Sequence, residues 1–277
     1  MVASYPSGVQ GRAPVGMTAW DRLAPAYGLA VPDHFSQFGE RLLSRVRVDP
    51  SAAVLDLACG PGTMASVMAR MAPPVDVVAV DLSVGMLHRA AREVTVHRAG
   101  RCAVAAMDAH LLGLVDRAFG LVLCGSALDS FPDPGRALAE AHRVLRPGGT
   151  LGLWVAPRWW WQGDSRWTWH DDLLAGLGVD AGGVPSGLAA PAALRQMLQA
   201  AGFQDVQVRA EELGLWFPDA EAWWRWAWSH GFRQVLERLS AGQLGAYREA
   251  CRTRIGHGGI EARMEALIAT AARHYGA

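Results

Sequence analysis

Val54-Leu55-Asp56-Leu57-Ala58-Cys59-Gly60-Pro61-Gly62-Thr63 is the stretch that decides the fold of this 277-residue chain. Residues 52–57 form an apolar run, which predicts a buried strand that ends at the glycines. Apolar side chains then recur at helical spacing, at Met64, Val67, Met68 and Met71. The stretch therefore predicts a strand, a tight loop and the start of a helix.

The predicted loop suits a nucleotide-like ligand. A side chain at Gly60 or Gly62 would hold such a ligand away from the backbone N–H groups that open the helix. Asp56 adds a carboxylate at the end of the strand, which suits a ligand with an ammonium group. The glycines also fit the relaxed dinucleotide fingerprint Gly60-x-Gly62-x-x-Ala65, with Asp81 at nearly the expected distance downstream. The loop alone leaves both kinds of ligand open.

An aspartate follows each of the next two predicted strands: Asp81 follows 75–80 and Asp108 follows 102–107. A helix is predicted over 134–145, and the predicted strands of this half of the chain cover 52–57, 75–80, 102–107, 119–124 and 150–155. Strands that alternate with helices indicate βαβ units and a mainly parallel sheet, whose ligand lies at the carboxyl ends of the strands. We therefore expect Asp56, Asp81 and Asp108 at one edge of the sheet.

The segments on either side of this region are less regular. Residues 1–17 are rich in Gly, Pro and Ser and are expected to form a flexible leader. From Thr18 onward, apolar positions predict two amphipathic helices that are interrupted near Pro32. In the second half, a helix over 192–201 leads into a sixth strand that follows Gly202.

The composition argues against several classes of partner. The chain has 26 basic and 26 acidic residues and a pI near 7.1, so it has no basic excess to neutralise the phosphates of a nucleic acid. The scattered cysteines favour a reducing, cytoplasmic setting over a disulfide framework or a zinc site. We expect no membrane partner, because the sequence has neither a secretory leader nor an apolar run of about 18 residues. A homo-oligomer remains open.

All 26 basic residues are arginine, and the sequence contains neither lysine nor asparagine. The absence of lysine excludes a Walker loop, a Schiff-base nucleophile and the Tyr-x-x-x-Lys pair of many nicotinamide reductases. The dinucleotide interpretation of the glycine loop is weaker for that reason.

With these motifs together, the chain resembles the class I S-adenosylmethionine-dependent methyltransferases, specifically the small-molecule branch with the ubiquinone and menaquinone biosynthesis enzymes. The matching stretches are 54–62, 80–81, 107–109 and 119–149. The resemblance implies an α/β, Rossmann-like fold: a seven-stranded, mainly parallel sheet with helices on both faces, N-terminal helices and a helical, Trp-rich lid insertion. It also implies a final antiparallel strand, although 264–274 reads locally as an Ala-rich helix, and we follow the family.

The family architecture implies one methyltransferase domain over 18–277. Within it, residues 18–156 are expected to form the cofactor-binding core. Residues 157–190 and 219–255 are expected to form lid elements beside the substrate.

The resemblance implies S-adenosylmethionine as the cofactor and a site without metal. Carried onto this sequence, it places Gly60 and Gly62 near the methionine part, Asp81 at the ribose hydroxyls and Asp108 at the adenine amino group. The implied cofactor residues are Tyr27, Asp56, Ala58, Gly60, Gly62, Asp81, Leu82, Met86, Met107, Asp108, Ala109, Cys124 and Gly125. One departure is Leu128-Asp129-Ser130-Phe131, where many relatives carry histidines.

Candidate substrate residues lie in the second half of the chain. Aromatic residues at helical spacing are most often core, but at least two of four tryptophans are expected to touch the substrate: Trp161, Trp169, Trp223 and Trp226. His170 and His230 are candidate bases for a phenol or enol, and each also fits a locally hydrogen-bonded histidine. The weaker candidates are Asp129, Asp172 and Tyr247.

The sequence therefore predicts methyl transfer to an apolar or aromatic small molecule, in secondary metabolism, with the accepting atom left open. A second hypothesis is a methyltransferase fold that keeps the cofactor and catalyses a cyclisation or rearrangement, since binding and transfer use overlapping residues. A nicotinamide-dependent reductase is the third and least favoured.

Overall fold

The structure is a computed structural model. It describes residues 20–69, 75–96, 101–159, 161–162, 164–180, 188 and 190–274, so the predicted leader lies outside the described residues.

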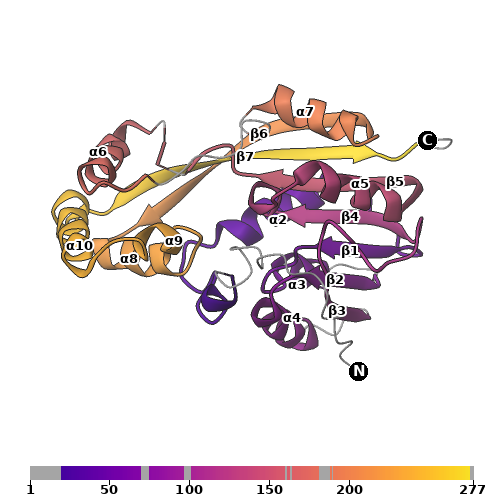
Figure 1. Cartoon of the computed structure of the whole chain (residues 1–277), viewed down its shortest axis with the longest axis horizontal. Helices are drawn as coiled ribbons and strands as arrows, with labels where there is room; N and C mark the ends of the chain where they lie inside the picture. Colours follow the sequence, from indigo (N-terminus) through magenta and orange to yellow (C-terminus); the bar gives the residue numbers. More distant parts are fainter. Residues whose placement is uncertain are drawn as a thin grey trace, which may run out of the picture.

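Seven strands of the described residues form one sheet, in the order β3-β2-β1-β4-β5-β7-β6 (Figure 1). The strands are β1 (Ala53–Leu57), β2 (Val77–Asp81), β3 (Cys102–Ala106), β4 (Phe119–Gly125), β5 (Leu145–Val155), β6 (Gln204–Phe217) and β7 (Ile260–Ala272). β1 to β5 pair in parallel, and β7 runs antiparallel to both β5 and β6. The predicted fold class is confirmed.

The register of the parallel strands brings the expected acids to one edge of the sheet. Asp56 is the second-last residue of β1 and pairs with Ala79, while Asp81 is the last residue of β2. The chain leaves β3 with Met107 N donating to Asp81 O at 3.0 Å, which places Asp108 next to the same edge. The apolar runs therefore end where their carboxylates can share one ligand site.

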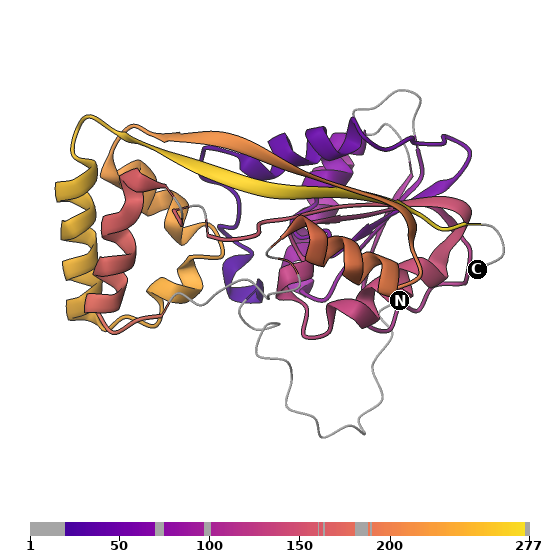
Figure 2. The ribbon, with the colours of Figure 1, turned by 90° about the horizontal axis from the view of Figure 1, so that it is seen from above.

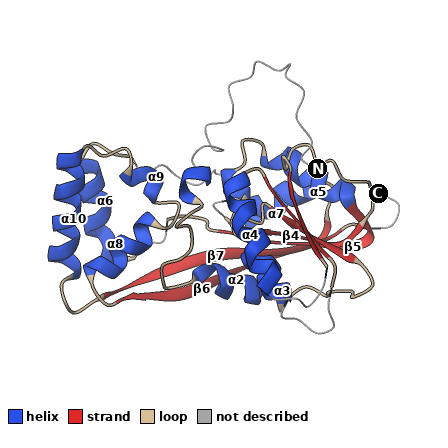
Figure 3. Cartoon of the chain, turned by 90° about the horizontal axis from the view of Figure 1, so that it is seen from below, coloured by secondary structure: helices blue, strands red, loops and turns tan. Residues whose placement is uncertain are grey.

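Helices cover both faces of the sheet (Figure 3). α2 (His34–Leu43), α3 (Thr63–Ala69) and α4 (Val84–Val96) form one layer, and α5 (Pro134–Val144) and α7 (Pro191–Ala200) form the other. α5 starts with proline at a position where no backbone N–H is needed, and Asp133 caps it by accepting from Arg136 N at 3.0 Å. Separate apolar clusters fill the two faces, one around Phe38 and Trp154 and the other around Leu138 and Leu194.

β6 and β7 are longer than the other strands and extend beyond their ends. A second group of helices lies at the far end of this strand pair (Figures 1 and 2). These helices are α6 (Thr168–Gly176), α8 (Ala220–Trp228), α9 (Arg233–Leu236) and α10 (Ala241–Ile255). Buried Trp167, Trp223 and Tyr247 join the same apolar cluster as Trp154 of the sheet. The aromatic residues of the second half therefore continue the core of the first.

Three local sequence patterns give a different structure from their simplest interpretation. The Ala-rich segment 264–274 is mostly strand, as the family resemblance predicted, because β7 lies between two strands that satisfy its backbone groups. β5 begins at Leu145, five residues before the predicted strand over 150–155. In the described residues, the first N-terminal helix covers 20–23 and turns follow over 24–28.

The helices of the described residues include none with the length and apolarity needed to cross a membrane.

Gly62 is required for packing in the loop after β1. Its φ is +91°, and a Cβ there would lie 2.9 Å from Ala90 Cα of α4. Gly62→Ala should therefore lower the free energy of unfolding by about 2–4 kcal/mol, through backbone strain and overpacking. The measurement is urea denaturation, with Gly176→Ala as the control, since a Cβ at Gly176 meets nothing within 4 Å. Equal stability of the two variants would contradict this role of Gly62.

Candidate functional site

The glycine loop is held against the end of β2. The Asp81 carboxylate accepts from Gly60 N and from Ser83 N, both at 2.8 Å, and Cys59 N donates to Val80 O at 2.9 Å. Gly60 has φ +53°, and the position of its missing Cβ is open space. The loop is thus fixed by one carboxylate while its glycine leaves room for a ligand.

Asp56 is a buried carboxylate at the base of this loop, with 1% of its surface exposed. It accepts from Ala65 N at 3.1 Å. Burial raises the pKa of Asp56 to about 7, and the nearby Asp81 carboxylate adds to this effect. A cationic group of a ligand would stabilise its ionised form, because burial penalises an unpaired charge.

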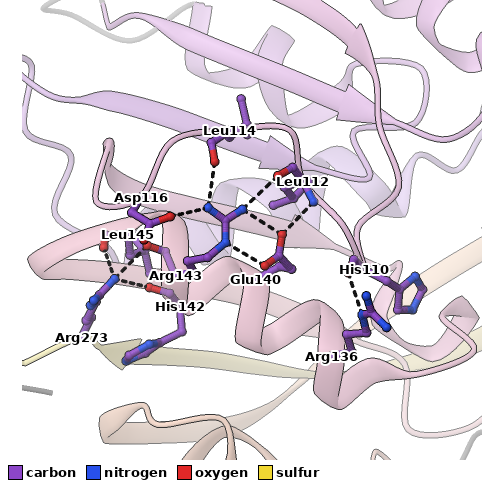
Figure 4. A network of polar contacts seen from close by, with 10 residues as sticks. All are labelled: His110, Leu112, Leu114, Asp116, Arg136, Glu140, His142, Arg143, Leu145 and Arg273. Atoms are coloured by element: carbon purple, nitrogen blue, oxygen red, sulfur yellow. Dashed lines mark hydrogen bonds and ion pairs between the residues drawn. The ribbon is translucent and has the colours of Figure 1, made fainter. Parts of the chain in front are cut away.

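Asp108 opens a turn that α5 holds in place. Asp108 Oδ1 accepts from His110 N at 2.9 Å and lies 2.6 Å from His110 Nδ1. Arg136 Nε donates to His110 O at 2.9 Å, and the Arg143–Glu140 pair bonds to the loop beyond it at Leu112, Leu114 and Asp116 (Figure 4). The turn with Asp108 is therefore anchored to a helix along its length.

A cavity of about 440 Å³ lies among these carboxylates. Most of the predicted cofactor residues line it: Tyr27, Asp56, Ala58, Gly60, Asp81, Leu82, Met86, Met107, Asp108, Ala109 and Gly125. Gly62 and Cys124 do not; Gly62 packs against α4, and Cys124 is buried in the core with Val122. We refer to this space as the first cavity.

The segment 20–35 crosses the structure beside the first cavity. Arg89 of α4 donates to Ala24 O at 2.8 Å and to Tyr27 O, and Asp21 accepts from Gly85 N at 3.0 Å. On its other side, Gly28 N donates to Ser229 O at 2.8 Å. The segment therefore connects α4 of the core to the end of α8.

A second cavity, of about 400 Å³, adjoins the first. The two share five lining residues: Trp20, Tyr27, Phe35, Ser126 and Ser130. Aromatic side chains of the second cavity are Trp20, Tyr27, Phe35, Trp159, Trp226 and Phe232, and its polar or charged ones include His34, Asp129, Arg158, His230 and Arg238. A molecule in this space would lie directly beside a ligand in the first cavity.

His230 lines the second cavity with 3% of its surface exposed. Its Nδ1 lies 2.8 Å from Trp226 O, and because a carbonyl only accepts, Nδ1 carries the proton and Nε2 the lone pair. Nε2 is buried and has no hydrogen-bond partner in the described part of the chain. The ring stacks on Trp226 at 4.3 Å and on Phe35 at 5.4 Å.

His170, the other predicted base, lies in a different environment and lines neither cavity. It is buried in the aromatic cluster of the second group of helices, with Nε2 2.6 Å from the Tyr247 hydroxyl and the ring 4.5 Å from Trp161. Burial lowers its pKa to about 3. The two candidate bases therefore differ in position: His230 lines the second cavity and His170 does not.

The predicted substrate tryptophans are separated in the same way. Trp226 lines the second cavity, whereas Trp161, Trp169 and Trp223 pack around His170. Trp20, His34 and Phe35 line the second cavity without having been predicted. Their sequence signal is the amphipathic pattern of the N-terminal segment, which indicates burial but not the partner.

The comparisons with known proteins agree with this geometry. Residues 55–153 match the family model described as a methyltransferase domain. A nocamycin O-methyltransferase from Saccharothrix syringae is 33% identical over 233 residues, which cover 79% of this chain and 82% of that protein. The chain belongs to the S-adenosylmethionine-dependent methyltransferases.

Solved structures of this methyltransferase fold extend the likeness. Phosphoethanolamine N-methyltransferase 2 from Haemonchus contortus, in complex with S-adenosylmethionine, gives a TM-score of 0.56 at 15% identity, over 94% of this chain and 57% of that one. The [4+2]-cyclase SpnF gives a TM-score of 0.58 at 21% identity, over 87% and 82%. At these identities the likeness concerns the fold.

S-adenosylmethionine is the cofactor of this methyltransferase, and the first cavity fits it. Buried Asp56 suits the ammonium of the methionine part, and the open side of Gly60 leaves space along the loop. Bound there, the cofactor supplies an electrophilic methyl group on a sulfonium. The residues expected to hold its ribose and adenine, Asp81 and Asp108, lie at the neighbouring strand ends.

Asp81 offers the sharpest test of the first cavity. Asp81→Ala should weaken S-adenosylhomocysteine binding by roughly 10–100-fold, because it removes a carboxylate that both anchors the loop and faces the ligand. Isothermal titration calorimetry measures the change. Asp76→Ala is the matched control: this half-buried aspartate precedes the same strand at its other end, lines neither cavity and should leave binding unchanged. Wild-type affinity in Asp81→Ala would place the cofactor elsewhere.

Proposed function

We propose that the enzyme transfers the methyl group of S-adenosylmethionine to an oxygen of a small molecule with an aromatic or apolar body. The observation that carries this proposal is the second cavity, which shares a wall with the first cavity and is lined by His230, whose buried Nε2 has no hydrogen-bond partner among the described residues. Six aromatic side chains on its walls favour a ring or another apolar body.

His230 is proposed as the base. As the substrate oxygen attacks the methyl carbon, the C–S bond breaks and its electron pair stays on sulfur. The hydroxyl proton passes to His230 Nε2, while the other ring proton stays on Nδ1 and is donated to the Trp226 carbonyl oxygen. Burial lowers the pKa of His230 to about 4, so it is neutral near pH 7. A weak base suffices, because an oxygen that is gaining a methyl group becomes a strong acid.

We propose that the reaction needs no metal. The described ranges contain no group of three or more His, Cys, Asp or Glu side chains that could hold one. Alignment of the two reactants in adjoining cavities supplies rate by proximity instead.

A role in secondary metabolism is proposed from the relative named as a nocamycin O-methyltransferase, which also supports oxygen as the accepting atom. Cyclisation in the same pocket remains the competing proposal. Product mass separates the two reactions, since methylation adds one CH₂ and a rearrangement adds nothing.

The two predicted histidines provide a matched pair of variants. A panel of phenols, enols and aromatic acids is first assayed for S-adenosylhomocysteine formation, and the best acceptor is then used for kinetics. His230→Phe should lower kcat by roughly 10²–10⁴-fold, because it removes the base while keeping an aromatic ring against Trp226. S-adenosylhomocysteine affinity should stay at the wild-type value.

His170→Phe should leave kcat near the wild-type value and lower stability, because His170 lines neither cavity and bonds to buried Tyr247. Equal losses of kcat in both variants would refute the assignment of His230. No methylated product from any acceptor, despite cofactor binding, would favour the competing rearrangement.

A further inference from the structure

Asp129 is an acidic residue that the methyl-transfer proposal leaves without a role. It lies in the short 3-10 helix η1 (Leu128–Ser130), which follows β4. Its neighbour Ser130 lines both cavities, and Asp129 lines the second. The residue is thus placed at the substrate side of the junction between the cavities.

The second cavity is lined by Asp129 and His230, each of which has a buried acceptor atom, and by His34, whose Nδ1 is also buried without a partner in the described ranges. Asp129 Oδ1 comes from the loop after β4, and His230 Nε2 comes from the end of α8. Both atoms are buried and without a hydrogen-bond partner in the described ranges. Burial raises the pKa of Asp129 to about 6. Above that pH the carboxylate is ionised and can only accept hydrogen bonds.

The two arginines that line the second cavity do not neutralise the Asp129 carboxylate. Arg158 pairs with Glu265, and Arg238 donates to Asp180 O at 2.7 Å. Both arginines are exposed, whereas His230 is buried. Ser126, Ser130 and Tyr27 carry hydroxyls that donate or accept, so they do not select the charge of a ligand.

Unsatisfied buried acceptors favour a ligand that brings donors. A site built to bond a substrate hydroxyl strongly disfavours an analogue that leaves its polar groups unpaired. A carboxylate at this place would leave both acceptors unpaired and would repel Asp129. An uncharged hydroxyl beside a second donor would satisfy both.

We propose that Asp129 determines substrate specificity: it selects substrates whose reacting end is an uncharged hydroxyl beside a second hydrogen-bond donor, and it rejects those with a carboxylate there. The inference rests on the proposed function, because it assigns the second cavity to the substrate. It narrows the substrate class from any aromatic acceptor to hydroxylated aromatic or enolic molecules that carry no acid at this end.

Two matched probes test the proposal by titration into protein saturated with S-adenosylhomocysteine, at about pH 8. One is a naphthalene diol with adjacent hydroxyls, and the other is the hydroxynaphthoate in which a carboxylate replaces one of them. Wild type should bind the diol at least roughly tenfold more tightly. Asp129→Asn should reduce this ratio by about tenfold, since an amide donates to a carboxylate.

Asp172→Asn is the control, because Asp172 is exposed and lines neither cavity, and it should keep the wild-type ratio. Asp129→Ser provides a second variant in case Asp129→Asn does not fold. A wild-type preference for the naphthoate, an unchanged ratio in both Asp129 variants, or no binding of either probe would overturn the inference. Failure to bind S-adenosylhomocysteine itself would instead refute the proposed function.

Discussion

The Arg89 side chain holds the backbone of the N-terminal segment, and the site depends on this interaction. Arg89 bonds to the carbonyls of Ala24 and Tyr27, while Gly28 N bonds to Ser229 O on the other side. Tyr27 is thereby fixed at the wall that the two cavities share. Without this connection both cavities would lose the wall that Trp20, Tyr27 and Phe35 provide. One segment is thus bonded both to α4 of the sheet's helical layer and to the residue that follows α8.

The sheet supplies the other half of the arrangement. Parallel strands end together, so carboxylates that follow separate apolar runs meet at one edge. Asp81 then orders the glycine loop through two backbone N–H groups, and α5 orders the turn that carries Asp108. The long β6–β7 pair extends from the same sheet to the second group of helices, α6, α8, α9 and α10 (Figure 2). The elements that line the first cavity and those that line the second are therefore joined through one sheet.

Much of the cofactor site could be predicted from sequence because its signals are local: an apolar run, then a glycine loop or an aspartate. The substrate side could not. His170 and His230 both lie among tryptophans in sequence, yet one bonds to Tyr247 and the other opens onto a cavity. That difference depends on contacts with residues far along the chain. The ambiguous segment 264–274 shows the same effect, since pairing with two strands outweighs alanine's helical preference.

We expect the methyl donor and its acceptor to meet where the two cavities share a wall. A crystal structure of the complex with S-adenosylhomocysteine tests it most directly. The account predicts the amino group beside Asp56, the ribose at Asp81, and the thioether sulfur facing the second cavity next to Tyr27 and Ser126. A sulfur that faces away from that cavity, or a side chain that closes the path from sulfur to His230, would contradict the account.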